Sequence, residues 1–74
     1  MTESMRRMPP RAPGRLLRMA EVEREVSLER SSIYRLIREG SFPRQIRVGK
    51  RASRWSQTAI DDWKIEKMAA TQPG

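Results

Sequence analysis

The chain of 74 residues contains neither cysteine nor histidine, and this double absence limits both how it can fold and what it can do. Disulfides and thiolate zinc sites, the usual supports of very small domains, are excluded. The fold must therefore depend on one compact apolar core, because a chain of this size buries only about 60% of the surface that its unfolded state exposes. The commonest general base, metal ligand and strong nucleophile are also missing, so we expect no enzyme, no metal site and no cofactor.

Positive charge is concentrated in the middle of the chain. Residues 30–54 carry eight Lys and Arg against Glu39 alone, an excess that equals the net charge of +7 of the whole chain. Such a cluster repels itself unless an anionic partner neutralises it, which favours a polyanion as the partner. All but Lys50 are arginines, whose planar forks suit phosphates and guanine edges.

The positions of the prolines and of the apolar residues indicate how the chain is organised. Three of the five prolines fall in residues 1–14, which show almost no periodic apolar pattern. We therefore predict a disordered basic arm over residues 1–14, a folded domain over residues 15–69 and a disordered tail over residues 70–74. No apolar run approaches the roughly 18 residues that a bilayer requires, and no secretory pattern follows the basic start. We expect a cytoplasmic protein with no membrane partner and no small-molecule substrate.

Two helices joined by a short turn are predicted after an extended piece at Leu16 and Leu17. Apolar residues recur twice at helical spacing, as Met19, Val22 and Val26 and again as Ile33, Leu36 and Ile37. The first set predicts an amphipathic helix of about two turns, and the second a helix from about Glu29 to Glu39 that ends at Gly40. This arrangement is typical of a helix-turn-helix.

A hairpin and a last helix are predicted to follow Pro43. Alternation over residues 45–55, with a turn at Gly49 and Lys50, indicates a β-hairpin whose inward side chains are Ile46, Val48 and Trp55 and whose outward ones are Arg47 and Arg54. Ser56 is a suitable N-cap for a helix through about Met68, in which Trp63 is expected to pack in the core. The predicted class is therefore α+β, mainly α: a small winged helix-turn-helix with a two-stranded hairpin wing.

The candidate DNA-binding residues lie on the second helix and on the hairpin. On a helical wheel the face opposite the apolar stripe carries arginine and hydroxyl side chains, which suit a reader of the major groove. The candidates on this recognition helix are Arg30, Ser31, Ser32, Tyr34, Arg35 and Arg38. The candidates on the wing, which suits the minor groove, are Arg44, Arg47, Lys50, Arg51 and Arg54. Three alternatives stay open: a merely solvated basic surface, RNA as the ligand, and an adaptor that docks on an acidic protein.

Three motifs together carry a resemblance to a known family. They are SSIYRLI at residues 31–37, GSFP at 40–43, and RASRW at 51–55 followed by DDWK at 61–64. In this order and spacing, the run from Leu16 to about Ala69 resembles the AlpA family of phage and prophage regulators, which have an excisionase-like, MerR-related winged-helix fold. The resemblance implies a transcriptional regulator that binds duplex DNA near the bacterial nucleoid. It also implies the alternative of an excisionase, or recombination directionality factor, that bends DNA at an attachment site.

The resemblance is compatible with two protein partners, and the sequence differs from the usual family pattern at two positions. A second copy of the chain, bound cooperatively or in tandem, and an integrase are both compatible with it. Family members usually have Gly where Ser27 stands, and Ser or Thr where Glu29 stands, so the turn and the N-cap are altered. Glu29 is expected either to accept hydrogen bonds from the start of its helix or to pair with Arg30.

Overall fold

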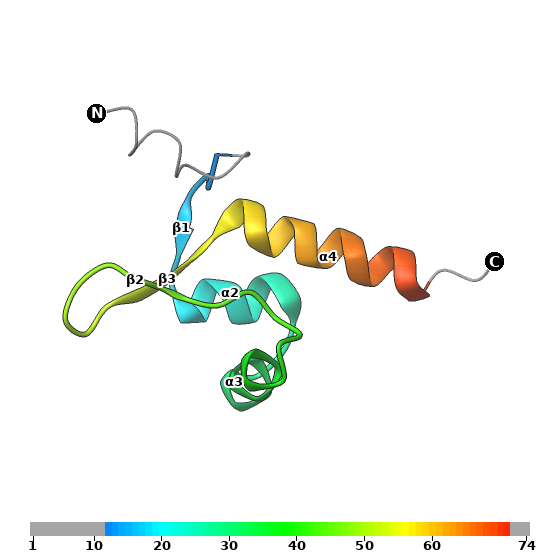
Figure 1. Ribbon diagram of the computed structural model, residues 1–74, viewed down its shortest axis with the longest axis horizontal. Coiled ribbons are helices and arrows are strands. Elements are labelled where there is room, and N and C mark those ends of the chain that lie inside the picture. Colours follow the sequence, from blue (N-terminus) through cyan, green and yellow to red (C-terminus); the bar gives the residue numbers. More distant parts are fainter. Residues whose placement is uncertain (1–11, 72–74) are drawn as a thin grey trace.

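The computed structural model describes residues 12–71, and Figure 1 shows helices packed beside a small sheet from which a loop projects. Its elements in chain order are β1 (Leu16–Leu17), α2 (Met19–Val26), α3 (Arg30–Arg38), β2 (Ile46–Arg47), β3 (Ser53–Ser56) and α4 (Gln57–Thr71). Most of the predicted arm and the last three residues of the predicted tail lie outside the described residues. No helix within residues 12–71 combines the length and apolar character needed to cross a membrane.

The helix-turn-helix is confirmed, and a residue in the left-handed conformation lies just beyond the end of each of its two helices. Helix α2 ends where Ser27 takes φ 58° and ψ 39°, and the Ser27 N–H donates to the Glu23 carbonyl at 2.8 Å. Helix α3 begins after Glu29, and Gly40, with φ 76°, turns the chain beyond its last residues. Gly adopts such angles without strain, whereas a residue with a Cβ does not.

The sheet has one strand more than the predicted hairpin. Its order is β1-β3-β2, with both pairs antiparallel. Leu17 lies opposite Trp55 in the first pair, and Ile46 lies opposite Arg54 in the second. The short extended piece thus joins the wing to the helices, and the whole is a small winged helix-turn-helix.

The predicted inward side of the hairpin is wrong for two residues. Ile46 and Val48 are 41% and 46% exposed, while Trp55 is buried. Directly paired residues share a face of a sheet, so the register that sets Ile46 opposite Arg54 puts both on the face away from Trp55. The wing also projects beyond the helices (Figure 1), so no element within residues 12–71 covers either of its faces near the tip.

The core lies where the helices meet β3. Its buried side chains, contributed by every segment from β1 to α4 except β2, are Leu17, Val22, Ile33, Phe42, Trp55 and Ile60. Leu36, Ile37 and Trp63 pack against this cluster while staying partly exposed, so the predicted apolar stripe of α3 is confirmed. Phe42 was not predicted as a core residue; its ring meets that of Trp63 edge-on, with 4.9 Å between centroids.

Both tryptophans fasten the loop that separates α3 from the wing. The Trp63 indole N–H donates to the Ser41 carbonyl at 2.8 Å, and that of Trp55 donates to the Pro43 carbonyl at 3.1 Å. Residues 41–43 are therefore held at both ends by core side chains. This loop connects α3 to the wing, so these bonds anchor the chain between the two basic elements.

Helix α4 begins as predicted and runs past its predicted end. The Ser56 hydroxyl accepts from the Ala59 N–H at 3.1 Å, which confirms it as the N-cap, and donates to the Pro13 carbonyl at 2.8 Å. The second half of α4 extends beyond the core, and its Ile65 is 63% exposed (Figure 1).

Candidate nucleic-acid interface

Helix α3 presents its predicted candidates to solvent. Five of the six are exposed, namely Arg30, Ser31, Tyr34, Arg35 and Arg38, and Ser32 is half-buried. On the other side of the helix Ile33 is fully buried. The 3.6-residue period thus separates a polar, arginine-rich face from the anchoring apolar stripe. The exposed face is free to contact a partner along the length of α3.

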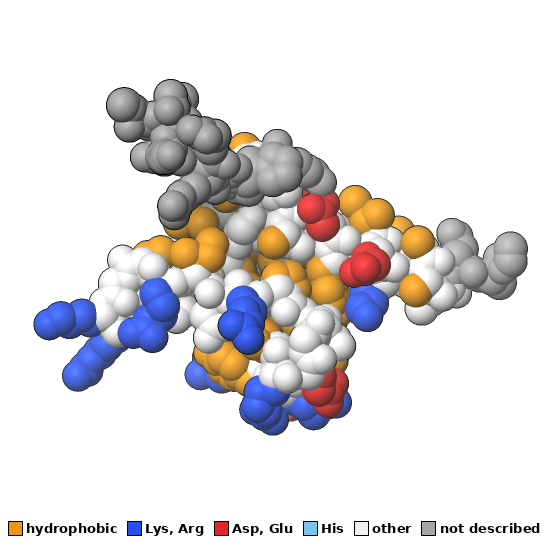
Figure 2. Space-filling model, viewed as in Figure 1, with side chains coloured by type: hydrophobic (Ala, Val, Ile, Leu, Met, Phe, Trp, Pro, Cys, Tyr) orange, Lys and Arg blue, Asp and Glu red, His pale blue; other side chains and the backbone are white. Residues whose placement is uncertain are grey.

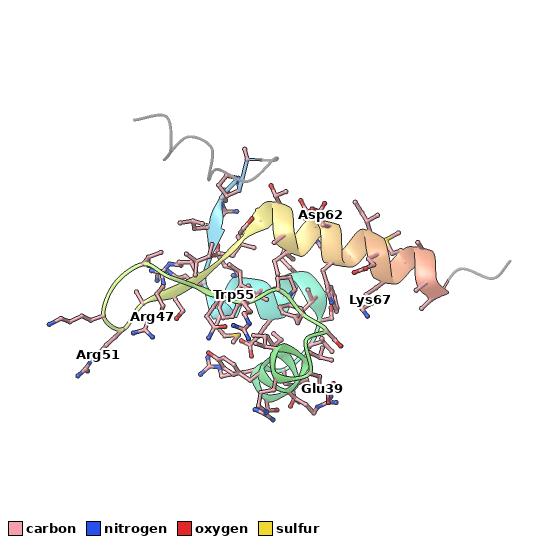
Figure 3. All side chains as sticks on the ribbon, viewed as in Figure 1. Glu39, Arg47, Arg51, Trp55, Asp62 and Lys67 are labelled. Carbon is pink, nitrogen blue, oxygen red and sulfur yellow. The ribbon has the colours of Figure 1, made fainter. Side chains whose placement is uncertain are left out.

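The wing carries its basic side chains at the end of the hairpin. The predicted wing residues that are exposed are Arg44, Arg47, Lys50 and Arg51, and Arg54 is half-buried in β3. The turn is closed by a bond of 2.9 Å from the Val48 N–H to the Ala52 carbonyl and by one of 2.9 Å from the Arg47 guanidinium to the Lys50 carbonyl. Figure 3 shows Arg51 extending from the tip away from the helices.

The two basic elements lie on a common side of the molecule. In Figure 2 most of the visible Lys and Arg side chains gather over the wing and around α3, whereas the visible acidic side chains lie over α4, together with Lys67, and at one end of α3. A groove of about 470 Å³ connects the two elements, and the predicted residues that it brings together are Arg30, Tyr34, Arg51 and Arg54. The other predicted candidates do not line this groove; they lie elsewhere on α3, in β2, at the wing tip and in the loop before β2.

The arginines of this surface are mostly without acidic partners. Within residues 12–71, the sole ion pair that involves a predicted candidate joins Arg35 to Glu39 at 3.9 Å, and both side chains are more than half exposed. An ion pair this long and exposed contributes little. Glu29, at the N-cap of α3, forms neither a capping hydrogen bond nor an ion pair with Arg30 in the described part of the chain, so both expectations for its side chain are wrong.

The acidic residues that are neutralised lie elsewhere. A hydrogen bond from the Arg18 backbone N–H lowers the pKa of Glu21, which also pairs with Arg15 at 2.8 Å. A hydrogen bond from Lys64 at 2.6 Å lowers the pKa of Glu25, and the same contact raises the pKa of Lys64. These contacts tie α2 to the chain before it and to α4, so they stabilise the scaffold and involve none of the arginines of α3 and the wing.

Arg18 is a groove residue that the sequence did not reveal. It is exposed at the N-cap of α2 and lines the groove together with Arg30, Arg51 and Arg54. In the sequence Arg18 lies outside the basic cluster of residues 30–54. The pairing of Leu17 with Trp55 brings Arg18 beside the wing, and no local sequence pattern predicts that pairing.

Comparison with known proteins assigns the chain to a family. The model of the family described as prophage CP4-57 regulatory protein (AlpA) matches residues 15–68. The chain belongs to the AlpA family. An uncharacterized protein of Enterobacteria phage P4, ORF88, is 34% identical over 67 residues, which cover 90% of this chain and 76% of that protein. The AlpA match runs from the start of β1 through most of α4, and it therefore includes both basic elements and confirms the resemblance.

Proposed function

We propose that this AlpA-family protein is a sequence-specific binder of double-stranded DNA that acts in the bacterial cytoplasm as a transcriptional regulator of a phage, prophage or mobile element. The observation that carries the proposal is the shared groove: arginines from α3 and from the wing line it together, and those that line it form no ion pair within the described residues. A duplex would neutralise both sets at once. The family description, a prophage regulatory protein, supports the same reading.

Helix α3 is suited to the major groove. Arg35 and Arg38 extend from its exposed face, and the guanidinium fork fits the O6 and N7 acceptors of guanine. Ser31 and Tyr34 add hydroxyls on the same exposed face, for phosphates or base edges. Base discrimination is therefore assigned to α3, with Arg35 as its central side chain.

The wing is suited to the minor groove and the backbone. Its tip presents Arg47, Lys50 and Arg51 on a narrow two-stranded projection, and the minor groove concentrates negative potential that attracts such side chains. Because Trp55 and Trp63 hold the loop before the wing, the separation between α3 and the tip is set before DNA arrives. Such preorganisation lowers the entropic cost of binding.

A salt titration tests the proposal. Fluorescence anisotropy of a labelled duplex should show affinity falling on the order of a thousandfold or more between about 50 and 200 mM salt, as several phosphate contacts require. Unlabelled duplex should compete better than single-stranded DNA or RNA of the same sequence. Equal competition by RNA would favour RNA as the ligand, and a salt-independent affinity for DNA would leave an acidic protein as the better partner.

Selection from random duplexes, followed by footprinting on the surrounding genome, then separates regulation from excision. Selected sites that fall in promoters would support transcriptional regulation. Arrays of sites beside an integration site would favour the excisionase alternative, which uses the same surface. A selection that enriches no sequence would contradict sequence-specific binding altogether.

A further inference from the structure

The groove between α3 and the wing receives arginines from three separate segments. Arg18 comes from the N-cap of α2, Arg30 from the first turn of α3, and Arg51 and Arg54 from the wing. Tyr34 also lines the groove, and Met19 and Trp55 contribute apolar surface. The β1–β3 pairing, the helix-turn-helix and the hairpin together bring four guanidinium groups to one groove.

A second groove on the same molecule combines arginines with acidic side chains. It is lined by Arg15 and Arg24 together with Glu21 and Glu25, and Arg15 pairs with Glu21 at 2.8 Å. The first groove contains no acidic residue among its lining side chains, and none of its four arginines forms an ion pair within residues 12–71. Four unpaired arginines repel one another, so an anion in that groove relieves a cost that the free protein bears.

The chemistry of the lining selects a phosphate group. Guanidinium forks bind phosphate oxygens in bidentate fashion, and the Tyr34 hydroxyl is a further donor. The groove is lined by residues of α3 on one side and of the wing on the other, so a DNA strand that runs from one element to the other passes over it. A strand in that position brings its phosphodiester groups to the four arginines.

We propose that this groove is a phosphate clamp for the DNA strand that runs between α3 and the wing, and that Arg18 is one of its anchors. The inference rests on the proposed DNA-binding function and adds to it a residue outside both the recognition helix and the wing. Because phosphates are the same at every base pair, the clamp contributes affinity and register without sequence preference.

The test compares Arg18→Gln with Arg24→Gln. Both substitutions remove one positive charge near α2, but Arg24 lines the second groove with its glutamates. We expect Arg18→Gln to weaken binding to the preferred duplex and to a random duplex by the same factor, and to reduce the slope of log affinity against log salt by about one. Arg24→Gln should leave both quantities near their wild-type values, and Arg18→Lys, which keeps the charge, should restore the slope.

The outcomes separate the clamp from the function on which it depends. If the wild-type chain shows no salt-dependent binding to duplex DNA, the proposed function fails. If the wild type binds and Arg18→Gln keeps the full salt slope while its thermal melting is unchanged, the function stands and the clamp is refuted. A loss confined to the preferred duplex would also refute it, because Arg18 would then read a base.

A last measurement distinguishes a strand from a free anion. Trp55 borders the groove and Trp63 does not, so a change in tryptophan fluorescence that persists in Trp63→Phe should report occupancy. We expect inorganic phosphate added to the DNA-free protein to produce no saturable change at submillimolar concentration, and a duplex to produce one. Saturation by inorganic phosphate alone, abolished by Arg18→Gln, would make the groove a site for a free anion and overturn the assignment to DNA.

Discussion

Replacing Ser27 with glycine should stabilise the protein. Ser27 ends α2 in the left-handed region, at φ 58° and ψ 39°, where a side chain with a Cβ costs roughly 1–2 kcal/mol. Glycine avoids that cost but loses about 0.5–1 kcal/mol more conformational entropy on folding. Ser27 is exposed and its hydroxyl forms no hydrogen bond within residues 12–71, so nothing else is lost. The bond from its N–H to the Glu23 carbonyl remains available to glycine.

The net gain therefore lies between about 0 and 1.5 kcal/mol, and its midpoint of about 0.75 kcal/mol raises the melting temperature of a domain of this size by about 3–6 °C. Thermal unfolding followed by far-UV circular dichroism measures it. Ser27→Ala is the control, because it keeps the Cβ and should bring no gain. Gly40→Ala is the mirror experiment: its added Cβ would meet nothing within 4 Å, so the expected loss of about 1 kcal/mol is purely conformational. An unchanged or lower melting temperature for Ser27→Gly would refute the reasoning.

Three further predictions follow from the core, the interface and the scaffold. Ile33→Ala should cost about 2–5 kcal/mol by chemical denaturation, whereas Ile65→Ala, at an exposed position of α4, should stay within about 0.5 kcal/mol; equal losses would contradict the core assignment. Arg35→Ala should weaken binding to the selected duplex by about 1–3 kcal/mol and spare random DNA, and equal loss on both would make Arg35 a phosphate anchor. The Lys64 hydrogen bond lowers the pKa of Glu25. The stability that this contact gives the folded state is therefore complete above the usual glutamate pKa and is lost as pH falls through the lowered pKa of Glu25. Wild-type protein should therefore lose more of its melting temperature below about pH 4 than Glu25→Gln does, and parallel pH profiles would argue against this contact.

The helices were predictable because their signals are local. The spacing of Ile33, Leu36 and Ile37, the stop at Gly40 and the cap at Ser56 each act within a few residues, and each has the predicted role in the structure. The concentration of arginine in residues 30–54 is likewise a property of composition alone. From these signals the sequence predicted a helix-turn-helix with a basic helix and a basic hairpin behind it.

Contacts between distant residues decided the rest. The register that pairs Ile46 with Arg54 turned two apolar side chains outward, and the pairing of Leu17 with Trp55 added a third strand. The same pairing carried Arg18 to the groove, and packing against Trp63 drew Phe42 into the core. Periodicity states which residues of a segment share a face, but strand register and the packing of neighbouring elements determine which face is covered. The sequence alone therefore determined the elements and their charge, and the tertiary structure determined which arginines share one groove.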